Sequence, residues 1–261
     1  MNQRIKKVIF GSNLKMYKTN HETLAYLARL QELTKDILRD LLELFILPSY
    51  TAIADCCRMV DPALVRIGAQ NVHWHSEGRF TGEISARMLQ ELGADFVMIG
   101  HAERRQFFGE TDLMVNKRVL TSLNIGFHVL ICVGDSAQDK ELGIFKERLS
   151  MQLKTALHGV KKDQLSRVWV AYEPVWAIGE GGTVATPDYA NSIHNVLHNL
   201  IEDLYPEIGG QVPILYGGSV NMNNAADLIV QPRIDGLFIG RAAWDANNFN
   251  QVIRIAIQAI N

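Results

Sequence analysis

Cysteine is scarce in this chain of 261 residues, with thiols only at Cys56, Cys57 and Cys132. Three thiols, two of them adjacent in sequence, form neither a disulfide framework nor the spaced ligand pairs that a zinc site needs. A chain without a disulfide framework suits a reducing compartment. We therefore expect a cytoplasmic protein without a metal site.

Long hydrophobic runs and an excess of charge of one sign are also missing. Near the N-terminus only Val8, Ile9 and Phe10 form an apolar run after the basic residues, which is too short for a signal-peptide core or a membrane span. A formal net charge of −2 offers no basic field that would attract nucleic acid or an anionic membrane. The expected partner is therefore a small molecule, and neither nucleic acid nor a membrane.

Short apolar runs recur through the whole chain, and segments with helical periodicity separate most of them. The hydrophobic content of 48% is enough for a sizeable core. Helix starts are marked by a capping box at Thr19 and Glu22, by Ser136 before a periodic run to Leu157, and by Thr186 before Pro187. The eight apolar runs are VIFGSNLK at 8–15, LFILPS at 44–49, LVRIGAQN at 64–71, FVMIGH at 96–101, FHVLICVG at 127–134, RVWVAYEP at 167–174, PILYGG at 213–218 and GLFIGR at 236–241.

This alternation predicts an α/β fold with a parallel sheet. Strands that are apolar almost throughout are buried on both faces, as in a parallel sheet covered by helices. No Pro-rich linker or low-complexity tract interrupts the pattern, so residues 1–261 are expected to form a single domain, a closed (β/α)8 TIM barrel. The alternative is an open, doubly wound sheet, but the first apolar run lacks the GxGxxG that such folds carry there.

Polar residues end several of the apolar runs, and in a barrel of this kind the chemistry lies at those carboxyl ends. Each residue alone has an ordinary structural explanation: a solvated lysine, a histidine that caps a helix, glycines in tight turns. Their convergence on one mouth of the barrel instead predicts a site. The set comprises Asn13, Lys15, His101, Glu103, Glu173, Gly217, Gly218, Ser219, Gly240 and Arg241.

The same residues lie in motifs that resemble the triosephosphate isomerase family. The matches follow the family's order and span essentially the full chain, and AYEPVWAIG together with YGGSV is highly specific. The motifs are N-x-K at 13–15, GAQNV at 68–72, FTGEIS at 80–85, IGHAERR at 99–105, AYEPVWAIG at 171–179, YGGSV at 216–220 and IDG at 234–236.

The resemblance implies an aldose–ketose isomerase that interconverts dihydroxyacetone phosphate and glyceraldehyde 3-phosphate through an enediolate, without a cofactor. By this resemblance Glu173 is the base, and neutral His101 polarises the carbonyl and moves protons between the oxygens. Lys15 supplies positive charge, with Asn13 beside it, and Glu103 is expected to position Lys15.

The resemblance also implies a phosphate site, a lid and a partner subunit. Backbone amides are expected to hold the phosphate, from Gly179, Gly218, Ser219, Gly240 and Arg241. The predicted lid comprises Pro174, Val175, Trp176, Ala177, Ile178 and Gly179, and its closure would exclude water from the enediolate. Thr81, in FTGEIS, resembles the loop by which family members dock into a second subunit, so we expect a homodimer.

The chain departs from the family pattern around the substrate. These departures leave two sugar phosphates as candidate substrates. The lid continues as EGGTVAT where the family commonly has TGKTAT, Leu14 replaces a Trp, Ala102 a Ser and Arg241 a glycine. Members resembling AIGExG and IDGLFIGRxAW act on phosphorylated erythrulose in polyol catabolism, so a four-carbon substrate is the rival hypothesis. A third hypothesis is a non-catalytic barrel that binds a phosphorylated metabolite, although Lys15, His101 and Glu173 are all retained.

Overall fold

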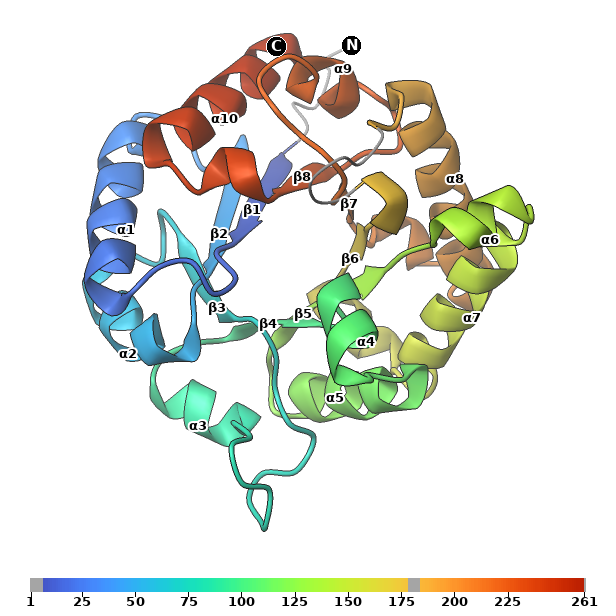
Figure 1. Ribbon diagram of the computed structural model, residues 1–261, viewed down its shortest axis with the longest axis horizontal. Coiled ribbons are helices and arrows are strands. Elements are labelled where there is room, and N and C mark those ends of the chain that lie inside the picture. Colours follow the sequence, from blue (N-terminus) through green and yellow to red (C-terminus); the bar gives the residue numbers. More distant parts are fainter. Residues whose placement is uncertain (1–6, 178–183, 261) are drawn as a thin grey trace.

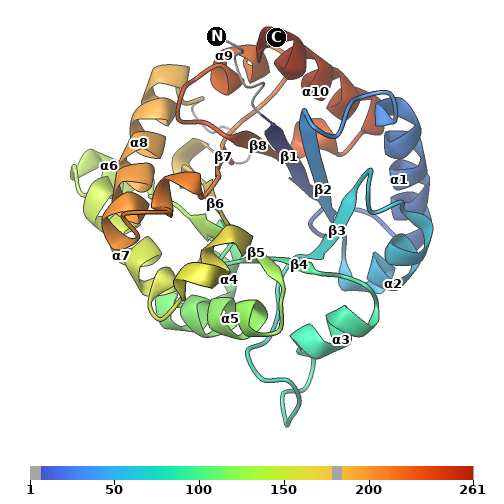
Figure 2. The same cartoon turned by 180° about the vertical axis from the view of Figure 1, so that it is seen from behind.

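Eight parallel strands close into a barrel in the computed structural model, which describes residues 7–177 and 184–260. Each strand pairs with its neighbours in sequence, and β1 pairs with β8 to complete the ring (Figures 1 and 2). The predicted closed (β/α)8 barrel is therefore confirmed, and the open sheet is excluded. The strands are β1 (Val8–Asn13), β2 (Leu42–Leu47), β3 (Arg66–Ala69), β4 (Phe96–Ile99), β5 (His128–Val133), β6 (Val168–Tyr172), β7 (Ile214–Tyr216) and β8 (Gly236–Ile239).

Helices surround the barrel as an outer ring (Figure 1). The α-helices are α1 (Asn20–Thr34), α2 (Tyr50–Met59), α3 (Ala86–Glu91), α4 (Ala102–Phe108), α5 (Asp112–Asn124), α6 (Ala137–Glu141), α7 (Phe145–Leu157), α8 (Pro187–Leu204), α9 (Ala225–Ile229) and α10 (Ala246–Ile260). Short 3-10 turns are η1 (Lys162–Arg167), η2 (Val175–Ala177), η3 (Gly209–Gln211) and η4 (Arg241–Ala243). Among the described residues, no helix is both long enough and apolar enough to cross a membrane.

Two of the predicted helix starts are confirmed in detail. The Thr19 side chain accepts a hydrogen bond from the Glu22 amide while the Glu22 side chain accepts from the Thr19 amide, which completes the capping box of α1. Thr186 caps α8, and Pro187 occupies its first turn, where no intrahelical amide donor is needed. Local sequence is thus sufficient to fix both boundaries.

The periodic run after Ser136 forms two helices rather than one. Ser136 caps α6, which ends at Glu141, and α7 begins at Phe145. Between them Gly143 has φ 73°, a left-handed conformation that breaks the helical path and that glycine adopts without a steric cost. The glycine is therefore the signal that separates the two helices.

Aromatic rings fill the interior of the barrel. Phe45 and Phe96 meet edge to face with ring centroids 4.9 Å apart, and Trp169 lies 5.2 Å from Phe96. Gly11 makes room for this packing, because a Cβ there would lie 1.9 Å from Cζ of Phe45. The filled interior gives the strand ends a rigid support, on which the polar residues of one mouth are held.

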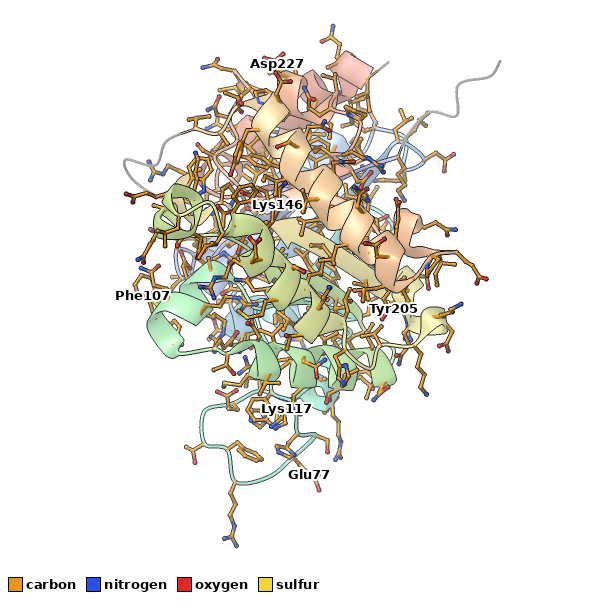
Figure 3. The ribbon with its side chains drawn as sticks, turned by 90° about the vertical axis from the view of Figure 1, so that its right-hand side faces the viewer. Glu77, Phe107, Lys117, Lys146, Tyr205 and Asp227 are labelled. Carbon is orange, nitrogen blue, oxygen red and sulfur yellow. The ribbon has the colours of Figure 1, made fainter. Side chains whose placement is uncertain are left out.

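The two ends of the barrel carry different segments. In the side view of Figure 3, Phe107 of α4 and Tyr205, which follows α8, lie toward opposite ends. The segment between β3 and α3, which carries Glu77, extends away from the barrel wall (Figures 1 and 3). The loops that follow the strands thus lie on the side of Phe107.

Candidate active site

His101 lies at the carboxyl end of β4 and caps the N-terminus of α4. Its Nδ1 accepts a hydrogen bond from the Glu103 amide at 3.2 Å, so Nδ1 carries no proton in this arrangement. The ring proton of the neutral imidazole is then on Nε2, which lies 3.1 Å from Oε1 of Glu173. The amide at the start of α4 thus favours the tautomer whose N–H faces the carboxylate.

Glu173 follows β6 and is only 2% exposed. Its Oε1 faces His101, and its Oε2 accepts the Ala102 amide at 2.9 Å. The backbone close to Glu173 is also tightly fitted, because a Cβ at Gly134 would lie 2.1 Å from the Glu173 carbonyl oxygen. The carboxylate is therefore buried and has a partner on each oxygen.

Cys132 lies on β5 near Glu173 and is fully buried. Burial, reinforced by the negative charge of Glu173, raises the pKa of the Cys132 thiol well above its ordinary value. The thiol therefore stays protonated at neutral pH and is a poor nucleophile.

Lys15 follows β1 in an unusual backbone conformation, with φ 52°. The Asn13 side chain accepts the Lys15 amide at 2.8 Å, and Gln70 donates to the Lys15 carbonyl at 2.9 Å. The ammonium group of Lys15 lies 2.5 Å from Oε1 of Glu103. The other Glu103 oxygen is 3.7 Å from Nδ1 of His101, so the Glu103 carboxylate lies between Lys15 and the His101–Glu173 pair.

The predicted phosphate residues follow neighbouring strands. Gly218 and Ser219 come after β7, and Gly240 and Arg241 come after β8; these two strands pair through Tyr216 and Leu237. Gly218 is buried, and a Cβ on it would lie 2.2 Å from the Tyr216 hydroxyl oxygen. The exposed Arg241 opens η4. The fold thus gathers these four residues at the ends of two adjacent strands, and Gly179 lies outside the described residues.

Only the first part of the predicted lid lies among the described residues: Pro174 and η2 are described, and Ile178 and Gly179 are not. Trp176 donates its indole N–H to Oδ2 of Asp135 at 3.0 Å, and Tyr172 donates its hydroxyl to Oδ1 at 2.7 Å. The ammonium of Lys140 lies 3.5 Å from the centroid of the Trp176 ring. The base of the predicted lid is therefore anchored to a buried carboxylate on the loop after β5.

Sequence reasoning missed Asp135, although a signal for it was present. Asp135 follows the apolar run at 127–134, so the rule that selected polar residues at strand ends also applies to it. Trp244 is singled out by the sequence only as the last residue of the IDGLFIGRxAW pattern, yet its indole N–H donates to the Asn13 carbonyl at 3.0 Å. No local pattern indicates a contact between residues so far apart in sequence.

The predicted docking residue Thr81 is exposed and lies in the projecting segment between β3 and α3. Within this segment the rings of His75 and Phe80 stack with centroids 4.7 Å apart, and His73 lies 4.3 Å from Phe80. The projection therefore has aromatic packing of its own, which includes Phe80 next to Thr81 in the chain.

Comparison with known proteins gives consistent matches over nearly the whole chain. A family model described as triosephosphate isomerase matches residues 8–256. The chain is 41% identical to L-erythrulose-1-phosphate isomerase of Rhizobium etli, over 96% of this chain and 93% of the relative. It is 38% identical to triosephosphate isomerase of Aquifex aeolicus, over 94% and 98%, and 40% identical to that of Solibacter usitatus, over 95% and 99%.

Proposed function

The chain belongs to the triosephosphate isomerase family, and we propose that it interconverts dihydroxyacetone phosphate and glyceraldehyde 3-phosphate. It is an aldose–ketose isomerase. The observation that carries the proposal is the 3.1 Å approach of the Glu173 carboxylate to Nε2 of His101, beside the Lys15–Glu103 pair. A buried base, a neutral N–H donor and a cation are what proton transfer next to a carbonyl requires.

In this proposal Glu173 removes a proton from C1 of the ketose phosphate. The electron pair of the C–H bond forms the C1–C2 double bond, and the carbonyl oxygen on C2 takes a proton from Nε2 of His101. His101 then recovers a proton from the oxygen on C1, and Glu173 returns its proton to C2, which yields the aldose. Lys15 stabilises the negative charge that develops on the oxygens during both transfers.

Gly218, Ser219, Gly240 and Arg241 are the proposed phosphate ligands, as they follow two adjacent strands at the same mouth. Backbone amides can hold the phosphate there without a cofactor or metal. The segment that starts at Pro174 is proposed to close over the site and exclude water, because an exposed enediolate phosphate can lose its phosphate.

A four-carbon substrate is the second candidate. The Rhizobium etli relative, at 41% identity, is named L-erythrulose-1-phosphate isomerase, and the same proton chemistry would act on an erythrulose phosphate. Arg241 and the lid sequence EGGTVAT, which differ from the common family pattern, would then form the walls that accept the additional carbon. This role would place the protein in polyol breakdown, whereas the triose reaction would place it in glycolysis and gluconeogenesis.

A side-by-side assay separates the two substrates. The purified protein is given dihydroxyacetone phosphate and each erythrulose phosphate enantiomer, and kcat/KM is compared. The proposal expects the triose to be preferred. A preference for the four-carbon sugar would replace it by the second candidate, and binding without turnover of either sugar would instead support a non-catalytic phosphometabolite-binding barrel.

The working form is proposed to be a cytoplasmic homodimer of single-domain subunits. Large apolar side chains are exposed around the site: Met16 is 95% exposed, and Phe107 and Phe108 are each 67% exposed. Together with the projecting Thr81 segment they offer apolar area that a second copy of the chain would cover. Sedimentation at micromolar concentration should give twice the chain mass, and a monomer would contradict the proposal.

A further inference from the structure

We propose that Trp244 is a positioning residue for Lys15, so that the loop after β8 sets the place of the catalytic ammonium. The inference rests on the proposed function, in which Lys15 stabilises the enediolate. Trp244 itself touches neither of the proton-transferring residues Glu173 and His101 in the contacts described above. It acts on the backbone segment Asn13 to Tyr17, which carries Lys15.

Trp244 contacts this segment at both of its ends. Its indole N–H donates to the Asn13 carbonyl at 3.0 Å, and its ring lies against that of Tyr17, with centroids 4.2 Å apart and planes inclined by 36°. Lys15 lies between these two contacts. The pairing of β1 with β8 ends one residue earlier, at Ser12 opposite Ile239. The indole therefore contacts the chain after β1 from the side of β8, beyond the last residue pair of these two strands.

The segment needs such support because its backbone is strained. Lys15 has φ 52°, in the left-handed region that residues other than glycine rarely occupy. Such a conformation persists only when surrounding contacts determine it. Those contacts include the Asn13 side chain on the Lys15 amide, Gln70 on the Lys15 carbonyl and Trp244 on the Asn13 carbonyl, beside backbone bonds such as that from the Leu14 amide to the Leu47 carbonyl.

Trp244 is itself rigidly placed. Its amide donates to the Arg241 carbonyl at 3.2 Å, and the preceding carbonyl, of Ala243, accepts the buried Tyr26 hydroxyl at 2.7 Å. The turn thus connects two parts of the proposed site. Gly240 and Arg241, the proposed phosphate ligands, lie at its start, and Trp244, which contacts the Lys15 segment, lies at its end. An indole held in this way can therefore fix the position of the Lys15 ammonium relative to the proposed phosphate ligands.

The test compares Trp244→Phe, which keeps a ring against Tyr17 but removes the N–H donor, with Trp244→Leu and with Tyr17→Phe as the matched control. The substrate is whichever sugar the wild-type protein turns over. We expect Trp244→Phe to lower kcat/KM about fivefold to tenfold, the effect of one neutral hydrogen bond, and to lower the melting temperature by no more than about 4 °C, because the Asn13 carbonyl loses its indole donor. Trp244→Leu should lose more, and Tyr17→Phe should match the wild type.

The Lys15→Met background separates positioning from a general structural role. If Trp244 acts through Lys15, then Trp244→Phe should cost less than about twofold in that background, because the group that it positions is gone. An equal loss in both backgrounds, or wild-type kcat/KM in Trp244→Phe, would overturn the proposal.

Amide hydrogen exchange gives a readout that does not depend on turnover. Trp244→Phe should speed exchange at residues 14–17 and leave the amides of β4 and α4 unchanged. Faster exchange at residues 14–17 would support the role of Trp244 even if the wild-type protein isomerised neither sugar. Absence of isomerisation would refute the proposed function alone. Unchanged exchange at residues 14–17 would refute the role of Trp244 itself.

Discussion

Replacing Asp135 by Asn tests whether a buried carboxylate anchors the base of the predicted lid. Asp135 is fully buried, and its two oxygens accept from Tyr172 and Trp176 at 2.7 and 3.0 Å. An Asn side chain has only one acceptor oxygen, so its amide group faces one of the two donors and leaves that donor without a partner. A buried unpaired donor costs about 1–3 kcal/mol.

We expect Asp135→Asn to lower the free energy of unfolding by about 2 kcal/mol, or about 4–8 °C in melting temperature for a domain of this size. Urea unfolding gives the free energy, and the isomerase assay should show a lower kcat/KM because Trp176 loses its anchor. Tyr172→Phe is the matched control: it removes one donor from the buried carboxylate, leaves the Trp176 bond intact and should cost about 1.5–3 kcal/mol, the range for a hydrogen bond to a charged group. A change below about 0.5 kcal/mol in Asp135→Asn would refute this reasoning.

Three further predictions concern stability and the phosphate site. Glu110→Ala removes the buried partner of the buried Arg118 and should cost about 3–5 kcal/mol in urea unfolding; a loss below about 1 kcal/mol would mean that the pair is not needed. Burial raises the pKa of the Cys56 thiol from 9.0 to about 12. As pH rises, the thiol therefore loses its proton at a lower pH in the unfolded chain than in the folded protein. Unfolding free energy should therefore fall as pH rises above about 9, and Cys56→Ala should show a smaller fall; identical pH profiles would contradict this assignment. Gly218→Ala places a methyl group 2.2 Å from the Tyr216 hydroxyl oxygen, so it should shift the phosphate turn and raise KM at least about tenfold; a wild-type KM would argue against this turn as a phosphate ligand.

The barrel itself was predictable because its signals are local. Each strand is an apolar run with a polar or glycine end, and caps such as Thr186 with Pro187 depend on neighbouring residues only. The division between α6 and α7 was missed, although Gly143 was visible, because a single glycine within a periodic run also occurs inside helices.

The sequence indicates which residue types gather at the candidate site, but not their geometry. The order of polar residues along the strand ends indicates that Glu173 and His101 meet, since the strand ends share one mouth. The left-handed backbone of Lys15 could not be predicted, because lysine has no preference for it. Nor could the bond from Trp244 to Asn13, which joins residues 231 positions apart through the closure of the barrel.

The most direct test of the proposed chemistry is the transfer of solvent deuterium to carbon. The wild-type protein and Glu173→Gln are incubated in D2O with the ketose phosphate that the wild type turns over, and deuterium at the carbon next to the carbonyl is followed by NMR. If Glu173 is the base, the wild type should incorporate deuterium and Glu173→Gln should be slower by at least about 100-fold, the contribution of a general base. Incorporation at the wild-type rate in Glu173→Gln would contradict the account.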